Sequence, residues 1–204
     1  MNKDDISWKV IDMMFKKNGN FLVKHHIESY NNFFNKGLKE IFKNRNPIHF
    51  DREKDSFNLY KHNAKIYMGG RNADKIYYGK PVIYDRNEDG EEREHYMIPN
   101  EARLRNMSYC FTIHYDVEID YKILLDNGTG DTNLREDGEN KGIPKLYDVH
   151  RETVVLEKIY LGRFPIMLRS DLCILNGLNP EVRFNMGECR NDKGGYFIID
   201  GKEK

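Results

Sequence analysis

Two arginines placed two residues apart are the clearest candidates for binding chemistry in this chain. Arg103 and Arg105 lie in the segment Glu101-Ala-Arg-Leu-Arg-Asn106, and in an extended segment both side chains would share one face. A guanidinium presents a planar fork of N–H donors, so the pair can hold phosphates or tie down carboxylates and backbone carbonyls. Because an isolated Arg-x-Arg is common, the residues alone favour the structural role, and the same holds for Arg169.

Two lysines near the carboxyl end are the second candidate contact. Lys202 and Lys204 follow Gly201, and positive charge of this kind contributes to binding only where it meets phosphate. Taken alone, the two lysines are equally consistent with a solvated chain end.

The sequence predicts no metal site and no catalytic constellation. Asp85-x-Asn87-x-Asp89-Gly90 copies the opening of a calcium-binding loop, but the twelfth position, which must be a bidentate glutamate, is Tyr96. A polar hairpin turn is the favoured interpretation, since Asp-Gly is a known hairpin signal. No His-x-x-x-His pair, phosphate loop or nucleophile elbow occurs. Buried reduced thiols are expected for the three widely spaced cysteines, Cys110, Cys173 and Cys189.

The composition is that of a folding chain with no net charge. Its 204 residues are 39% hydrophobic and 12% aromatic, enough for a core, and its 33 basic and 33 acidic residues cancel. Any nucleic-acid contact must therefore come from a local patch. No apolar run approaches the roughly 18 residues of a membrane span, and the start of the chain lacks a signal-peptide layout. We expect a soluble, intracellular protein with no membrane partner.

Helical periodicity dominates the first part of the chain, over residues 5–44. Apolar residues recur at helical spacing between Ser7 and Lys16, and Asn18-Gly19 supplies a left-handed stop. A second stripe runs from Val23 to Phe42 at intervals of three and four. The sequence therefore predicts two amino-terminal helices joined by a short turn.

Residues 57–204 have the short apolar runs of strands. The predicted strands include Ala64–Met68, Lys75–Tyr84 and, most clearly, the alternating segment Tyr109–Tyr121. Residues 126–148 are polar and lack periodicity, so we expect a surface loop there. The fold class is α+β: two amino-terminal helices followed by a mostly antiparallel sheet with long surface loops.

Four blocks in order resemble the start of the second-largest, beta-type subunit of cellular and large-DNA-virus RNA polymerases. The most specific, Ile98-Pro-Asn-Glu-Ala-Arg-Leu-Arg-Asn-Met-Ser-Tyr109, is similar to the family's Pro-x-Glu-Ala-Arg-Leu-Arg-Asn-Leu-Thr-Tyr. The others are Ser7–Ile41, in which Tyr30 replaces the family's phenylalanine, Leu161–Ser170 with Cys173 after it, and Gly187–Lys204 with its Gly-Gly-Tyr-Phe-Ile-Ile-Asp-Gly-Lys-Glu-Lys ending. The resemblance is weakest over 44–96 and 126–149.

The resemblance implies that residues 1–204 are the first leg of the domain called the protrusion, and that the domain is incomplete here. It implies a non-catalytic wall of the nucleic-acid cleft in DNA-templated transcription by a nucleotidyltransferase. The implied partners are the largest polymerase subunit, the rest of the chain's own subunit, the DNA template and nascent RNA. No cofactor is expected on this chain: magnesium is held by the largest subunit, and any zinc site lies outside these residues. The implied location is the nucleus, or a cytoplasmic virus factory and virion if the chain is viral.

The resemblance also suggests roles for individual residues. Those expected to face nucleic acid are Lys202, Lys204, Arg103 and Arg105. Those expected to build the motif are Glu101, Asn106, Arg169, Gly194, Gly195 and Glu203. Gly194-Gly195 is expected to bend the backbone where a side chain would clash, with Tyr196–Ile199 as a short buried strand after it. The alternative function is a free-standing interaction or nucleic-acid-binding module from a split or truncated polymerase subunit gene. A hydrolase with an unrecognised site is a third.

Overall fold

The structure is a computed structural model that describes residues 3–17, 20–86, 90–136 and 138–204. The chain divides into two compact units. The first unit comprises Met1–Gly37, Tyr78–Ile113 and Gly162–Lys204, and the second comprises Leu38–Tyr77 and His114–Leu161.

Helices open the chain, as the sequence predicts. The first is α1, Lys3–Lys17, and the second predicted stripe forms α2, Lys24–Asn32, a π-helical turn η1, Phe33–Gly37, and α3, Leu38–Arg45. The predicted stop at Asn18-Gly19 lies outside the described residues. Trp8 on α1 is 70% exposed. None of the helices in the described part of the chain is long and apolar enough to cross a membrane.

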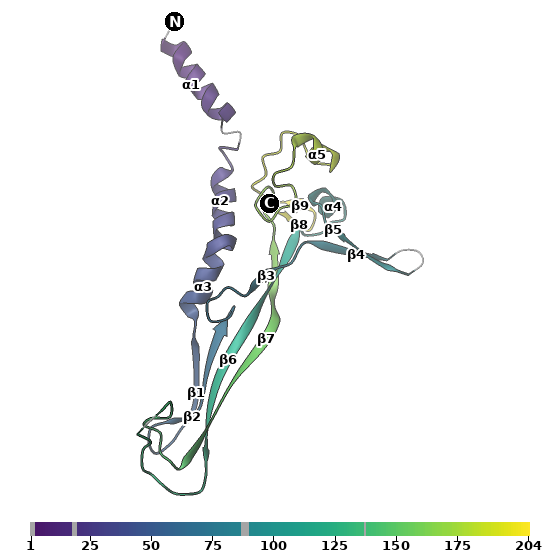
Figure 1. The fold of residues 1–204 in the computed structure, drawn as a ribbon. Coiled ribbons are helices and arrows are strands. Elements are labelled where there is room, and N and C mark those ends of the chain that lie inside the picture. The colour runs from purple at the N-terminus through teal and green to yellow at the C-terminus, as the bar shows by residue number, and fades with distance from the viewer. Residues whose placement is uncertain (1–2, 18–19, 87–89, 137) are drawn as a thin grey trace. The chain divides into compact units, whose positions relative to one another are not determined.

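The second unit is built on an antiparallel sheet (Figure 1). β1, Ile48–Lys54, pairs with β2, Tyr60–Met68, and β2 pairs with β6, Cys110–Asp126. Ile66 of β2 lies opposite both Ile48 and Ile119, so apolar residues share a face across three strands. β6 also pairs with β7, Tyr147–Pro165. The predicted antiparallel sheet is confirmed, but it begins at β1, before residue 57, where every residue is exposed.

The run Lys75–Tyr84, expected as one strand, is two. β3, Ile76–Tyr78, ends at Gly79, whose absent side chain leaves room for the Thr112 side chain, and β4, Val82–Arg86, begins after the break. β4 pairs with β5, Glu92–Tyr96, in an antiparallel hairpin, as expected for the Asp-Gly signal. Turn residues 87–89 lie outside the described part of the chain.

The core of the first unit surrounds the start of β6. Tyr109 and Phe111 are almost completely buried, with Ile166 and Ile198 around them. The ring of Phe34 lies 5.2 Å from that of Phe111, and the hydroxyl of Tyr30 donates to the carbonyl of Pro165 over 2.8 Å. Aromatic packing and one partly buried hydrogen bond thus join helix α2 and turn η1 to the strands.

Between β6 and β7, the described residues of the polar segment 126–148 have little regular structure beyond turns and an isolated bridge between Leu134 and Pro144. Its end nevertheless contributes to a small core in which Ile143, Leu146 and Tyr147 pack with Leu124. The remaining elements are short: α4, Pro99–Leu104, α5, Pro180–Asn185, β8, Ile198–Ile199, and β9, Lys202–Glu203.

Candidate functional site

The segment with the two arginines is a short helix and not an extended chain. Pro99 occupies the first turn of α4, where its missing N–H costs nothing, and Ala102 packs into the core. Asn106 ends the helix with a positive φ of 52°, and Met107 N–H donates to the Ala102 carbonyl over 2.8 Å. The expectation of an extended segment is therefore wrong. Residues two apart on a helix point to different sides, so Arg103 and Arg105 have separate partners.

Arg103 is the centre of a network in the first unit. Its Nη1 and Nη2 donate to the two carboxylate oxygens of Glu188 over 2.8 and 3.0 Å. Its Nε donates to Glu203 over 2.8 Å, and Nη2 also donates to the hydroxyl of Tyr196 over 2.9 Å. The Glu188 side chain is 3% exposed and that of Arg103 is 19% exposed. We call this set, Arg103, Glu188, Tyr196 and Glu203, the arginine lock.

The electrostatics of the arginine lock favour the charged pair. Burial alone would lower the pKa of Arg103, but the hydrogen bonds and negative charge of Glu188 outweigh it and raise that pKa above its ordinary value. For the Tyr196 hydroxyl, burial raises the pKa, so the group stays neutral and donates to Asp192 over 3.1 Å. A buried ion pair of this kind is retained only with good geometry and further hydrogen bonds, and the arginine lock has both.

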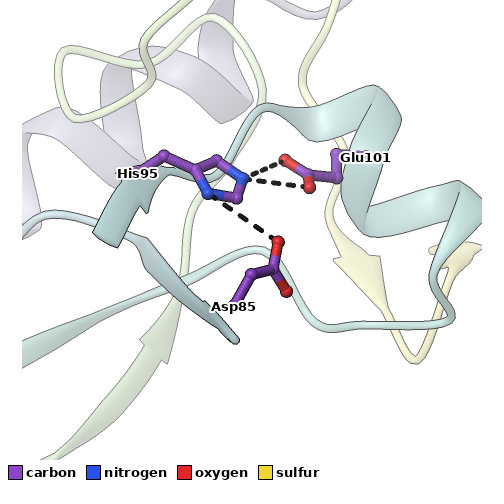
Figure 2. A group of neighbouring side chains, drawn as sticks. All are labelled: Asp85, His95 and Glu101. Atoms are coloured by element: carbon purple, nitrogen blue, oxygen red, sulfur yellow. Dashed lines mark hydrogen bonds and ion pairs between the residues drawn. The ribbon is translucent and has the colours of Figure 1, made fainter. Parts of the chain in front are cut away.

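Arg105 joins α4 to the β4–β5 hairpin. Its two terminal nitrogens donate to both oxygens of Asp85 over 3.0 and 2.6 Å, and Nη1 also donates to Glu101 over 2.9 Å. Figure 2 shows His95 of β5 between the two carboxylates: Nε2 lies 3.1 Å from Glu101 and Nδ1 lies 3.9 Å from Asp85. We call these four residues the hairpin clasp.

The three residues in Figure 2 could in principle hold a metal ion, because their ligand atoms lie within 4.8 Å of one another. Arg105 donates hydrogen bonds to both carboxylates, so one of the two negative charges is already compensated without a metal. Its hydrogen bonds hold the pKa of Asp85 below the ordinary value of 3.8. For Glu101, burial acts to raise the pKa, but Arg105 and His95 bring it below 4.5. Because folding lowers both carboxyl pKa values, the two carboxylates stabilise the folded state at pH above their ordinary pKa values. That contribution is lost as the pH falls through the pKa values of the folded state.

The last residues form a hairpin attached to α4. β8 and β9 pair through a two-residue turn in which Asp200 and Gly201 both have positive φ, 51° and 73°. Ser108 Oγ and the Asp200 carboxylate lie 3.0 Å apart in a hydrogen bond, and Gly201 N–H donates to Met107. A Cβ on Gly201 would approach Asn106 Cα to 2.8 Å, so the close contact requires glycine.

The hairpin presents its two lysines to solvent. Along β9, Glu203 faces Arg103, so Lys202 and Lys204 on either side of it share the opposite face. Both lysines are exposed, and neither has an ion pair within the described part of the chain. β8 covers only part of the strand predicted at Tyr196–Ile199. Ile198 in β8 is fully buried, as expected for a strand that positions a surface hairpin.

The two consecutive glycines bend the chain where no side chain fits, as predicted. Gly194 has φ of +70°, and a Cβ there would lie 2.5 Å from the Leu168 carbonyl oxygen. Gly195 has φ of +83°, and its Cβ would lie 2.8 Å from Cβ of Val23. Arg169 packs beside Gly194 and donates from Nη1 to the Asn20 side chain and to the Asp192 carbonyl over 3.2 and 3.1 Å.

The structure thus separates the predicted site residues into three groups. Arg103 and Glu203 belong to the arginine lock, and Arg105 and Glu101 belong to the hairpin clasp. Asn106, Arg169 and the two glycines shape the backbone between them. Apart from these three groups, Lys202 and Lys204 are exposed and have no ion pair within the described part of the chain, and their contact with nucleic acid stays a prediction. For Arg103 and Arg105, the guanidiniums are occupied by carboxylates, which favours the structural role.

Sequence reasoning missed the residues that complete both networks. Glu188 lies at the start of the block Gly187–Lys204, and its spacing from Arg103 carries no signal because 85 residues separate them. Asp85 was considered only within the calcium-loop and hairpin-turn pattern, and His95 was not singled out. Cys173 is buried as expected, but Cys189 is exposed, so the expectation of buried thiols is wrong there.

Comparisons with known proteins give one consistent answer. Residues 21–204 match the family described as RNA polymerase beta subunit. The chain is 31% identical over 198 residues to DNA-directed RNA polymerase II subunit RPB2 of Meyerozyma guilliermondii, an alignment that covers 97% of this chain and 15% of the relative. It is also 31% identical to DNA-directed RNA polymerase subunit Rpo2N of Methanothermobacter thermautotrophicus, of which 29% is covered, again by 97% of this chain. DNA-directed RNA polymerase III subunit rpc2 of Dictyostelium discoideum is 30% identical over 97% of this chain and 9% of its own length.

Proposed function

The chain belongs to the RNA polymerase beta subunit family and corresponds to the amino-terminal region of the second-largest subunit, and we propose that it forms a non-catalytic wall of the polymerase cleft. The observation that carries the proposal is the β8–β9 hairpin, which presents Lys202 and Lys204 to solvent while the arginine lock fixes its position. Fixed positive charge on a rigid support is what a phosphate backbone recognises.

The proposal assigns the chemistry to other parts of the enzyme. The chain spans about 15% of the length of the RPB2 relative and 29% of the Rpo2N relative, and its described residues contain no recognisable catalytic constellation. In the proposed enzyme, magnesium held by the largest subunit supplies the nucleotidyl-transfer chemistry, and any zinc site lies in other residues. The proposed partners are the largest subunit, the remainder of the same subunit, the DNA template and nascent RNA.

The proposed location follows from the proposed function. A transcription enzyme acts inside the cell, in the nucleus or, if the chain is viral, in a cytoplasmic virus factory. The alternative of a free-standing binding module is less favoured, because the similarity covers 97% of this chain and not one isolated segment. The net charge of zero also gives little support to autonomous nucleic-acid binding.

Replacing Lys202 and Lys204 by alanine in the assembled polymerase should weaken template binding by about tenfold at moderate salt. Each lysine that neutralises a phosphate contributes about one unit to the slope of log affinity against log salt, so that slope should become shallower by about two. Fluorescence anisotropy of a labelled template, measured across a salt series, gives both quantities.

The matched control is Lys36→Ala, which removes another exposed lysine of the first unit that has no ion pair in the described part of the chain. Its salt slope should equal that of the unaltered enzyme. If the double variant and the control have the same salt slope, Lys202 and Lys204 do not contact phosphate and the proposed orientation of the hairpin is wrong.

A further inference from the structure

The β4–β5 hairpin of the first unit carries two exposed tyrosines on a fixed support. One face of the hairpin is held by Ile83, which is 3% exposed, and by the hairpin clasp. Side chains alternate across a strand, so Tyr84, which lies between Ile83 and Asp85, points away from that support. Tyr84 is 65% exposed and Tyr96 is 54% exposed. Two large rings on one fixed, solvent-facing surface are typical of a contact surface.

The register of the hairpin places both rings and a carboxylate on this outward face. Tyr84 lies opposite Glu94, and Val82 lies opposite Tyr96. Opposite residues of an antiparallel pair share a face, with Cβ atoms about 5 Å apart, and diagonal neighbours are about 7–8 Å apart. A side chain that contacts the Tyr84 ring can therefore also reach the carboxylate of Glu94. We call Tyr84, Glu94 and Tyr96 the tyrosine face.

Tyr96 already receives a cation from its own chain. Nζ of Lys80 lies 4.9 Å from the centroid of the Tyr96 ring, a cation–π contact. Tyr84 has no such contact in the described part of the chain, and Arg86, two residues further along the same face, pairs with Glu92 over 2.9 Å. Glu94 forms no ion pair with any residue that the structure describes. A ring and a carboxylate that lie side by side are thus left without a cation.

The charge of the hairpin is complementary to a basic partner. Residues 85–94 include six acidic and two basic side chains, although the whole chain has no net charge. Such an acidic excess attracts cationic groups and repels the phosphates of nucleic acid. A second copy of the chain that docked through the same face would bring like charges together, so the hairpin does not favour self-association.

We propose that the tyrosine face binds an arginine-bearing segment of a partner polypeptide, with a guanidinium stacked on the Tyr84 ring and paired with Glu94. A guanidinium suits both contacts, because its flat face stacks on an aromatic ring while its edge donates hydrogen bonds to a carboxylate. The ammonium of lysine has no flat face to stack. The proposed partner differs in charge from the phosphates proposed for Lys202 and Lys204, and this inference does not depend on the proposed function.

Titration of the intact chain with two fluorescently labelled peptides of equal length and charge tests this proposal. One peptide alternates arginine with alanine, and the other alternates lysine with alanine. Fluorescence anisotropy at moderate salt should show saturable binding of both. The arginine peptide should bind about two- to fivefold more tightly, the range that one stacking contact at an exposed site contributes.

Two variants assign the binding to the tyrosine face. Tyr84→Leu should weaken binding of the arginine peptide about two- to fivefold and abolish the preference for arginine over lysine, an effect that charge alone does not produce. Glu94→Gln should weaken binding of both peptides about two- to fivefold and make it less sensitive to salt. Both side chains are exposed, so neither change removes core packing.

The matched controls are Tyr160→Leu, at a tyrosine that is 55% exposed, and Glu40→Gln, at an exposed carboxylate that has no ion pair within the described residues. Both controls should keep the affinity and the arginine preference of the unaltered chain. The proposal is overturned if the two peptides bind equally, if Tyr84→Leu keeps the preference, or if the controls weaken binding as much as the variants. Tighter binding of a single-stranded oligonucleotide, or self-association of the chain, would contradict it if either is lost in Tyr84→Leu, because another occupant would then use this face.

Discussion

Replacing Glu188 by leucine should lower the free energy of unfolding by about 3 kcal/mol, because removal of one member of a buried ion pair leaves the other charge uncompensated. The Glu188 side chain is 3% exposed and accepts two hydrogen bonds from Arg103. Leucine has a similar size and fills the space, so the loss reports the missing charge and not a cavity. Urea denaturation followed by circular dichroism gives the free energy.

Two further variants show whether this loss comes from the pair. Glu203→Leu removes the other carboxylate on Arg103, but Glu203 is 55% exposed, so the expected loss is below about 1 kcal/mol. Arg103→Met combined with Glu188→Leu should recover most of the stability, because apolar side chains often replace a buried pair without loss. A double variant as unstable as Glu188→Leu alone would show that the arginine lock does not act through the charge pair.

Gly194→Ala should destabilise the chain by about 3 kcal/mol, because it combines a left-handed backbone with a steric clash. Gly194 has φ of +70°, and the new Cβ would lie 2.5 Å from the carbonyl oxygen of Leu168, a backbone atom that cannot move aside alone. The displaced segment would disturb Arg169, whose Cγ lies 2.8 Å from the same point. Thermal and urea unfolding of the variant measure the loss.

Gly177→Ala isolates the backbone part of this effect. Gly177 belongs to the same unit and has nearly the same φ, +72°, but nothing lies within 4 Å of its Cβ position. Its substitution should cost about 1 kcal/mol, so the difference between the two variants measures the contact with Leu168. Equal losses at both glycines would mean that Gly194 is required only for its conformation.

Helices and strands could be predicted from the sequence where apolar residues recur with the period of a buried face. The segment Tyr109–Tyr121 alternates because one face of β6 is core, and its strand is confirmed. β1 has no buried residue, and its alternation of apolar and polar residues is limited to Ile48–Asp51, a pattern too short to have predicted the strand that pairs with β2. The single helix predicted from Val23 to Phe42 follows a true stripe, but a π-helical turn at Phe33–Gly37 interrupts it, and nothing in the stripe distinguishes that turn.

Several residues of the candidate site could be identified from the sequence, but the contacts that they make could not. Gly194 and Gly195 were identified because two consecutive glycines report a backbone constraint directly. Arg103 was identified by its motif, yet its main partner Glu188 is 85 residues away, and local spacing carries no information about such a contact. The error over α4 has a different origin: Pro99 in the first turn and Asn106 at the carboxyl end are local helix signals that sequence reasoning overlooked, and only the packing of Ala102 into the core is a tertiary feature.

The co-purification of the tagged chain from the cells that express it tests the central claim most directly. If the chain is a non-catalytic part of a polymerase, the largest subunit should be recovered with it, and the recovered complex should incorporate nucleotides on a DNA template while the chain alone does not. Recovery of the chain without the largest subunit, or nucleotide incorporation by the chain on its own, would contradict the account.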